Sequence, residues 1–345
     1  MDIKIRHTLL SFIILISLSI ISCGDDKKIE KKPTPLGNDL IVQLTKELDK
    51  NPKNKELLFN RANALYEINE YEASIKDLES AMRIDSLNPD YFHLLADNYL
   101  DYYRSREALA TMHKVVQMYP TREASLLKLA EMQLILRQYE NSISTVNAII
   151  MKNPLSSEAY FMLGMNFRSM KDIDRAINSF QTAVEFDSEL VDAWLILGEL
   201  HEKKGTKDAI KYYNNAMTIA PNKSEVIHSK AFYLQNHGDI PGALKLYKSI
   251  NIKDAQYVIA YLNAGILRLE QDSLDLAFEQ FNILISIQPQ NFLAYYYRGI
   301  IHKALNDNAK AKADFQNCLN INPKYKDAEL ALAKLIAQMD AQSKK

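Results

Sequence analysis

The sequence predicts an all-α solenoid, in which similar helix pairs stack along most of the chain. Prolines mark a fixed period, since Pro120 and Pro154 are 34 residues apart and so are Pro289 and Pro323. Within each period, two positions always hold small residues and two always hold bulky ones. A period of this length is typical of a solenoid, whose repeats contact only their neighbours.

The period divides most of the chain into eight repeats with the same arrangement of apolar residues. The repeats span 55–88, 89–122, 123–156, 157–190, 191–223, 224–257, 258–291 and 292–325. Counted from the first residue of a repeat, places 4, 7, 8 and 11 share one helix face, and places 20, 24, 27 and 28 share another. Place 8 is always Ala or Gly, place 20 is Ala or Ser, and place 24 is bulky. Each repeat is therefore predicted to be a helix pair that buries its apolar face only by stacking.

The fourth repeat carries the clearest motif. Its patterned places hold Tyr160, Leu163, Gly164, Phe167, Ala176, Phe180 and Ala183. This pattern resembles the tetratricopeptide repeat. The resemblance implies a right-handed superhelix whose concave face is lined by the first helix of each repeat, chiefly through places 2, 5, 9, 12 and 13. Place 7 departs from the family pattern, because Arg61, Lys230 and Arg298 replace the expected leucine.

A further helix is predicted at each end of the repeats. Residues 39–51 are predicted to form an N-terminal capping helix with Leu40, Leu44 and Leu48 on one face, and residues 326–345 a C-terminal capping helix. Capping elements with a polar outer face keep the open ends of a solenoid soluble.

Residues 1–22 are predicted to be an export signal. Lys4 and Arg6 precede an apolar run that ends just before Cys23, and this run is too short to span a bilayer but suits a signal peptide. A cysteine at this place resembles a bacterial lipoprotein signal, which implies cleavage before Cys23 and lipidation of its thiol. The alternative is an ordinary secretory signal or an uncleaved anchor. Residues 23–38 carry the lipidated cysteine and a charged, proline-containing segment that is predicted to be a flexible tether.

The lipoprotein resemblance also implies a place in the cell. Gly24 follows the cysteine, where some lipoproteins that stay in the inner membrane have aspartate. We therefore expect a lipid-anchored protein of the bacterial cell envelope at the outer membrane, and the periplasmic and surface faces both stay open.

The composition excludes several classes of function. The formal net charge is −1, so no general attraction to nucleic acid is indicated. Cys318 occupies a core place, and lipidation of Cys23 leaves no disulfide within the chain. The sequence has no phosphate-binding glycine loop, no metal-ligand motif and no nucleophile motif. We therefore predict that the protein is not an enzyme and holds no cofactor or metal.

The places that line the concave face in the family are acidic here, with only Arg168, Lys203 and Lys303 as basic residues. Like-signed walls of a groove attract the opposite charge, so a basic, partly apolar segment of another protein is the predicted occupant. The alternative is a solvated acidic helix face without a partner. The predicted groove comprises Glu56, Phe59, Asn63, Asp90, Asp97, Asp101, Leu127, Glu131, Glu158, Phe161, Asp192 and Glu199.

One branch of the family binds C-terminal carboxylates through conserved lysine, asparagine and arginine side chains. Asn63 matches that set, but Phe59 and Leu127 replace lysines and Glu131 replaces the arginine. An acidic groove repels a carboxylate, so this mode of binding is not expected.

These observations favour a membrane-anchored scaffold or adaptor that binds a protein or peptide partner. The rival function is a ligand-capture lipoprotein that passes a glycan or peptide to an outer-membrane transporter. The rival predicts exposed aromatic clusters, whereas most tyrosines fall at places that we assign to the core or to turns. Tandem repeats also self-associate readily, so a homodimer stays open.

Overall fold

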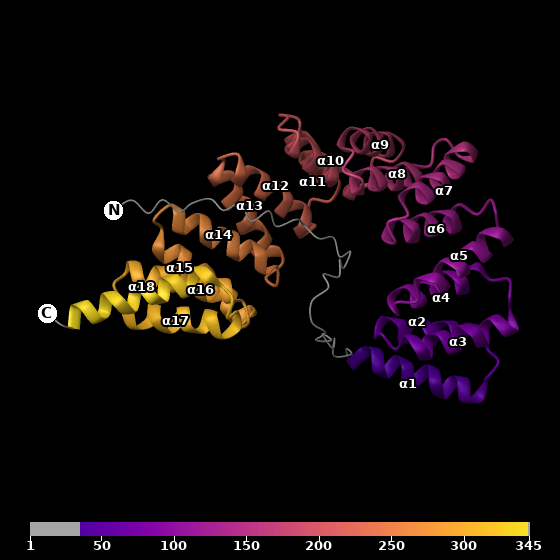
Figure 1. The fold of residues 1–345 in the computed structure, drawn as a ribbon, viewed down its shortest axis with the longest axis horizontal. Helices are drawn as coiled ribbons and strands as arrows, with labels where there is room; N and C mark the ends of the chain where they lie inside the picture. The colour runs from indigo at the N-terminus through magenta and orange to yellow at the C-terminus, as the bar shows by residue number, and fades with distance from the viewer. Residues whose placement is uncertain (1–34, 344–345) are drawn as a thin grey trace. The chain divides into compact units, whose positions relative to one another are not determined.

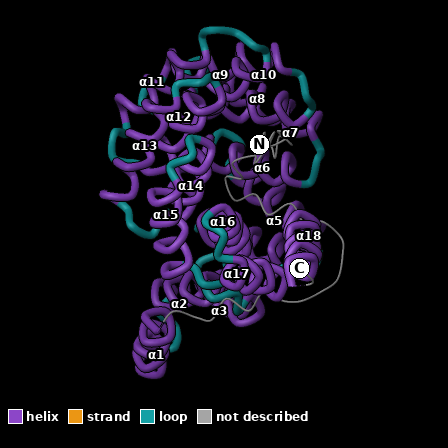
Figure 2. The backbone as a smooth tube through the Cα atoms, turned by 90° about the vertical axis from the view of Figure 1, so that its left-hand side faces the viewer, coloured by secondary structure: helices purple, strands orange, loops and turns teal. Residues whose placement is uncertain are grey.

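A computed structural model describes residues 35–343, and every regular element in that range is a helix (Figures 1 and 2). The predicted all-α fold of stacked helix pairs is confirmed. The first helices of the repeats are α2 (Lys55–Glu67), α4 (Pro89–Asp101), α6 (Glu123–Ile135), α8 (Ser157–Ser169), α10 (Val191–Lys203), α12 (Ser224–Asn236), α14 (Val258–Glu270) and α16 (Phe292–Ala304). The second helices are α3 (Tyr71–Ile84), α5 (Ser105–Met118), α7 (Tyr139–Lys152), α9 (Ile173–Phe186), α11 (Ala209–Ile219), α13 (Ile240–Lys253), α15 (Leu274–Ile287) and α17 (Asn308–Ile321). The terminal helices are α1 (Pro35–Lys50) and α18 (Lys326–Ser343).

The described residues divide into two compact units, which we call the N-terminal unit (residues 35–102) and the C-terminal unit (residues 103–343). The boundary falls between α4 and α5, inside the second repeat. Nothing in the periodicity predicts this boundary, because Ala96 and Ala108 keep the small residues of places 8 and 20 there. Within each unit, helices that follow one another in the chain pack together.

The first helices begin at the first residue of each repeat, and several are capped by the residue before. The Asn54 side chain accepts hydrogen bonds from the backbone N–H groups of Glu56 and Leu57, and the Ser156 side chain accepts one from Ala159. Such caps satisfy backbone donors that have no partner within the helix. The local sequence thus fixes where these helices start.

The turn inside each repeat uses one residue in the left-handed backbone region, at place 15. Only two of these residues are glycine, Gly205 (φ 69°) and Gly238 (φ 83°). The other turns hold L-residues there, at some conformational cost. They are Asn69, Tyr103, Arg137, Lys171, Asp272 and Asn306.

Small residues at place 8 make room for a bulky side chain at place 24 of the same repeat. Glycine faces an aromatic ring in four repeats, and a Cβ on Gly265 would lie 2.7 Å from Cζ of Phe281. Repeats with Leu, Met or Val at place 24 hold alanine at place 8. The sixth repeat is the exception to this division, because it combines Ala231 with the aromatic Tyr247. Glycine therefore allows a flat ring to reach the helix backbone. The glycine and ring pairs are Gly164 and Phe180, Gly198 and Tyr213, Gly265 and Phe281, and Gly299 and Phe315.

The arginines that depart from the family pattern at place 7 form partly buried ion pairs with place 23 of their own repeat. Arg61 Nε and Nη2 donate to the two carboxylate oxygens of Asp77 at 2.7 and 2.8 Å. Arg298 donates to Asp314 in the same two-pronged way at 2.8 and 2.7 Å. The carboxylates are 5% and 4% exposed, so these are charge-assisted bonds largely shielded from water. The first and last repeats thus each contain an ion pair between arginine at place 7 and aspartate at place 23.

The same arginines also donate a hydrogen bond to a helix that precedes their own repeat. Arg61 Nη1 donates to Thr45 Oγ1 of α1 at 3.1 Å, and Arg298 Nη1 donates to Asn282 Oδ1 of α15 at 2.8 Å. Each arginine therefore links its own repeat to the element before it.

The terminal helices differ in detail from the prediction. α1 begins at Pro35, inside the segment predicted to be tether, because proline is well tolerated at the first helical position. Leu44 and Leu48 are buried, but Leu40 is 47% exposed, so burial of the predicted apolar face begins one turn later. At the other end, Leu335 of α18 packs with Ala311 and Phe315 of α17.

Cys318 is fully buried, as its core place predicts. Burial raises the pKa of its thiol to about 11. The predicted signal peptide and Cys23 lie outside the described residues. Across residues 35–343, no helix has both the length and the apolar character that crossing a membrane requires.

Candidate partner-binding surface

The N-terminal unit holds six of the predicted groove residues. Glu56, Phe59 and Asn63 lie on α2. The Phe59 ring is half-buried against Tyr91, with 5.1 Å between ring centroids, and Asn63 Nδ2 donates to the Phe59 carbonyl at 3.0 Å. On α4 the groove residues are Asp90, Asp97 and Asp101.

A tyrosine links the two first helices of this unit. Tyr66 of α2 donates its hydroxyl to Asp101 Oδ2 of α4 at 2.6 Å. Burial raises the pKa of Tyr66, and the carboxylates of Asp101 and Asp97 add to this rise. The phenol is therefore a neutral donor at physiological pH, and it holds an exposed carboxylate in place.

Two further tyrosines continue from Tyr66. The Tyr66 and Tyr71 rings are 5.9 Å apart, and the Tyr71 and Tyr102 rings are 6.0 Å apart. The Tyr102 hydroxyl donates to Glu72, and Tyr102 is 38% exposed. We call Tyr66, Tyr71 and Tyr102 the tyrosine cluster. The sequence assigned the places of Tyr66 and Tyr71 to the core or to turns, whereas Tyr102 lies outside those places. The aromatic cluster that these three residues form beside carboxylates was not predicted.

The C-terminal unit holds the other six predicted residues. Leu127 and Glu131 lie on α6, Glu158 and Phe161 on α8, and Asp192 and Glu199 on α10. Leu127 packs at the edge of the core formed with Leu126 and Ala159, and Phe161 meets the Phe180 ring edge-on with centroids 5.4 Å apart. These apolar members are half-buried. They support the helix packing and leave only part of each side chain accessible to a partner.

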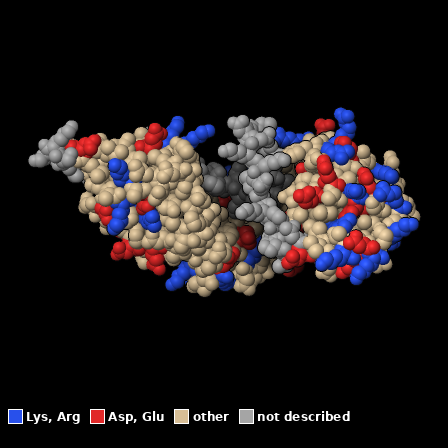
Figure 3. All heavy atoms as spheres, turned by 90° about the horizontal axis from the view of Figure 1, so that it is seen from below, with Lys and Arg blue, Asp and Glu red and all other residues tan. Residues whose placement is uncertain are grey.

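Three of the carboxylates in this unit have basic neighbours. Lys128 Nζ lies 3.1 Å from Glu131 Oε2, and Arg168 Nη2 lies 2.7 Å from Glu199 Oε2. Lys223 Nζ lies 3.7 Å from Asp192 Oδ1. Lys128 and Lys223 stand outside the places that we counted, so the sequence overestimated the negative charge of this surface. Figure 3 shows acidic and basic side chains interspersed on the face that it presents.

The ion pairs of Lys128 and Lys223 are weak. Exposed pairs of this kind stabilise a protein by only about 0–1 kcal/mol. Glu199 is more enclosed, and burial raises the pKa of its carboxyl while Arg168 opposes the rise. Glu158 is exposed and accepts a hydrogen bond from the Ser157 hydroxyl at 2.9 Å.

The described residues hold no cluster of metal-ligating side chains. Within residues 35–343, no group of three or more His, Cys, Asp or Glu side chains could hold a metal ion. His228, at place 5 of the sixth repeat, is buried, and burial lowers its pKa to about 4. Its Nε2 lies 3.1 Å from Asn263 Nδ2 and its ring lies beside Phe232 and Tyr257, so it serves packing as a neutral side chain.

Family models agree with the repeat pattern. The model described as tetratricopeptide repeat matches residues 55–86, 157–190 and 293–325, which fall in the first, fourth and eighth repeats. The chain therefore contains tetratricopeptide repeats.

Two of the curated relatives are named as members of complexes. The BBSome complex member BBS4 of Bos taurus is 25% identical over 182 residues, which are 52% of this chain and 35% of that protein. The anaphase-promoting complex subunit 3 of Schizosaccharomyces pombe is 22% identical over 214 residues, or 61% of this chain and 32% of that protein. The chain thus spans about a third of the length of these relatives.

A solved structure supports the fold. The C-terminal part of a TPR repeat-containing protein from Cytophaga hutchinsonii aligns with 70% of this tetratricopeptide-repeat chain and 99% of its own, at a TM-score of 0.56 and 19% identity. This likeness shows the shared fold of stacked helix pairs.

Proposed function

We propose that this tetratricopeptide-repeat protein is a scaffold or adaptor that binds a basic, partly apolar segment of a partner protein along its first helices. Tetratricopeptide-repeat proteins mediate protein–protein interactions and scaffold complexes, and the relatives named above belong to such complexes. The proposal assigns binding and not catalysis to the surface.

The observation that carries the proposal is the set of carboxylates on successive first helices, each beside an apolar or aromatic side chain. In the N-terminal unit, Asp97 and Asp101 lie near Tyr66. In the C-terminal unit, Glu131 follows the half-buried Leu127 on α6. Alternating charge and apolar surface suits a segment in which lysine or arginine alternates with apolar residues.

Reversing three of these charges tests the proposal. The variant Glu56→Lys, Asp97→Lys and Asp101→Lys, with all three changes in the N-terminal unit, is expected to bind a labelled peptide of alternating lysine and leucine about tenfold more weakly or worse, because three attractive contacts become repulsive. Fluorescence anisotropy of the full chain gives the dissociation constant.

A matched variant separates local from general electrostatics. Glu79→Lys, Glu140→Lys and Glu185→Lys make the same charge change at exposed positions of the second helices α3, α7 and α9. This variant should bind the peptide as the unchanged protein does. Equal losses in the two variants would mean that net charge, and not the first-helix surface, captures the peptide.

We further propose that the protein is anchored by lipid on Cys23 in the bacterial cell envelope, at the outer membrane. The support is the sequence alone, in which the cysteine directly follows an apolar run of signal-peptide length. More than one acyl chain gives the stable anchoring that a single chain does not. The anchor would keep the scaffold close to partners in the envelope.

Replacing Cys23 with serine tests the anchor. The unchanged protein should incorporate labelled palmitate and sediment with membranes, whereas Cys23→Ser should lose the label and leave the membrane fraction. Cys318→Ser is the control, because this buried thiol should be dispensable for both properties. Membrane association that persists without label in Cys23→Ser would favour an uncleaved anchor instead.

The tyrosine cluster supports a second candidate function, capture of a glycan or peptide ligand for an outer-membrane transporter. Aromatic rings beside carboxylates offer both a flat apolar surface and hydrogen-bond acceptors. The two functions differ in one measurement, since glycan capture requires binding of a neutral oligosaccharide that Tyr102→Ala reduces and that Glu131→Lys alone leaves unchanged.

A further inference from the structure

One second helix of the C-terminal unit is basic from Lys245 to its end. α13 carries Lys245, Lys248 and Lys253 and no acidic residue. Lys253 Nζ donates to the Pro221 carbonyl and to Asn222 Oδ1. Lys245 and Lys248 are exposed and, within the described residues, have no ion pair or hydrogen bond to a side chain. Like charges three residues apart on a helix repel each other, so this pair weakens the helix and gains nothing from a neighbour.

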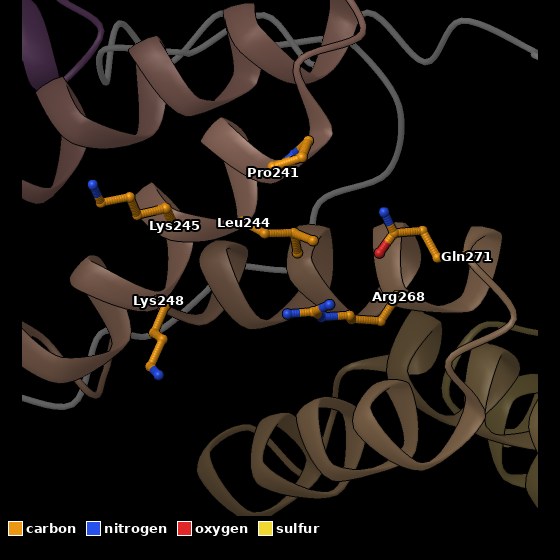
Figure 4. Close-up of a pocket in the computed structure, with 6 residues that line it drawn as sticks. All are labelled: Pro241, Leu244, Lys245, Lys248, Arg268 and Gln271. Carbon is orange, nitrogen blue, oxygen red and sulfur yellow. The ribbon is translucent and has the colours of Figure 1, made fainter.

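These lysines border a hollow between α13 and α14. The hollow has a volume of about 390 Å³. Figure 4 shows the Arg268 side chain extending from α14 toward α13, and Leu244 extending from α13 toward α14. Arg268 also has no carboxylate partner among the described residues. The lining residues are Pro241, Leu244, Lys245, Lys248, Arg268 and Gln271.

The lining specifies the chemistry of a ligand. A guanidinium binds a carboxylate through two parallel hydrogen bonds. Lys245 and Lys248, whose side chains extend away from Arg268 in Figure 4, add positive charge beside the hollow. Gln271 provides an amide that donates and accepts. Leu244 and Pro241 provide an apolar floor that a free inorganic anion would not use. The lining therefore suits a ligand that carries several carboxylates next to an apolar group.

We propose that this basic hollow binds an acidic, partly apolar peptide segment of a partner protein. Its carboxylates contact Arg268, Lys245 and Lys248, and an apolar side chain covers Leu244. Charge complementarity selects such a segment and repels the basic segment proposed for the first helices. The protein then has two binding surfaces of opposite charge, which suits a scaffold that holds two partners.

The surroundings favour a peptide over an anionic membrane. Attraction to a lipid surface grows with the number of basic residues facing it. Here the basic surface is narrow, because the exposed carboxylates of Glu270, Asp272 and Asp275 follow Arg268 directly along the chain. A segment with a few carboxylates fits this narrow surface better.

Peptide binding to the full chain tests the proposal. A labelled peptide of alternating glutamate and leucine is expected to bind with an affinity that falls as salt is raised, and a peptide with glutamine in place of glutamate is expected not to bind. Lys245→Gln with Lys248→Gln, and separately Arg268→Gln, should each weaken binding about tenfold. The control Lys207→Gln with Lys334→Gln removes two exposed lysines elsewhere in the same unit and should leave binding unchanged.

Several outcomes would overturn the proposal. Equal weakening in the control and in the Lys245 and Lys248 variant would show that the peptide senses only net charge. Unchanged binding in both hollow variants would place the peptide elsewhere. Stronger binding to phosphatidylglycerol vesicles than to the peptide, or full competition by inorganic phosphate at equal concentration, would assign the hollow to a membrane or to a free anion.

Discussion

Replacing Asp314 with alanine is expected to lower the free energy of unfolding by about 3 kcal/mol, because the change leaves an enclosed guanidinium without its carboxylate. Arg298 has a side-chain exposure of 21%, and both of its bonds to Asp314 are lost. His302 also lies 3.7 Å from this carboxylate. Urea denaturation followed by circular dichroism measures the loss, and hydrogen exchange should locate it in α16 and α17.

Removing both members of the pair is the control. Arg298→Met with Asp314→Leu leaves no unpaired charge and fills the same space, so it should cost less than about 1 kcal/mol. If the double variant is as unstable as Asp314→Ala, the pair matters through its shape alone and the electrostatic explanation of place 7 is wrong.

Replacing Phe281 with alanine is expected to lower the free energy of unfolding by about 3–5 kcal/mol, since it leaves a cavity in a well-packed core. The ring is fully buried, faces Gly265, and stacks on Tyr297 with centroids 5.4 Å apart. Thermal and urea unfolding measure the change, and protection of backbone amides should fall most in α14 and α15.

A double replacement tests whether the glycine and the ring act as a pair. Gly265→Ala alone should destabilise, because the added Cβ lies too close to the ring. In the Phe281→Leu background the same change should stabilise, since alanine is the better helix former and the ring is absent. Equal effects of Gly265→Ala in the two backgrounds would contradict the pairing.

The repeat period was enough to predict the fold, because the same arrangement of small and bulky residues recurs in each repeat. A single Gly164 or Phe180 carries little information, whereas small residues at place 8 and bulky ones at place 24 in every repeat specify two helices that touch there. The left-handed turn residues could not be predicted. Residues such as Arg137 and Lys171 adopt that conformation because the packed helices impose it.

The arginines at place 7 show what the pattern omits. Arg61 and Arg298 contradict the family pattern at their own position, and their partners stand 16 residues later at place 23. Aspartate occurs there only as Asp77 and Asp314. In the first and last repeats, arginine at place 7 and aspartate at place 23 occur together. This pairing can be recognised only when the sequences of both helices of a repeat are compared.

The candidate surface was predicted in part. Its residues lie on the expected first helices, but their charge depends on Lys128 and Lys223, which stand outside the places that the family uses. The contact of Tyr66 with Asp101 joins two repeats and depends on how α2 and α4 pack. The residue pattern within one repeat does not predict contacts between two repeats.

The central claim is that the first helices carry the partner-binding surface, and site-specific photo-crosslinking in cells tests it most directly. A photoreactive residue at Glu158 or Asp192 of the first helices should crosslink one protein, whereas one at Asn178 or Glu185 of α9 should not. All four positions are exposed in the C-terminal unit. Crosslinks to the same protein from α9 alone, or from all four positions equally, would contradict the claim.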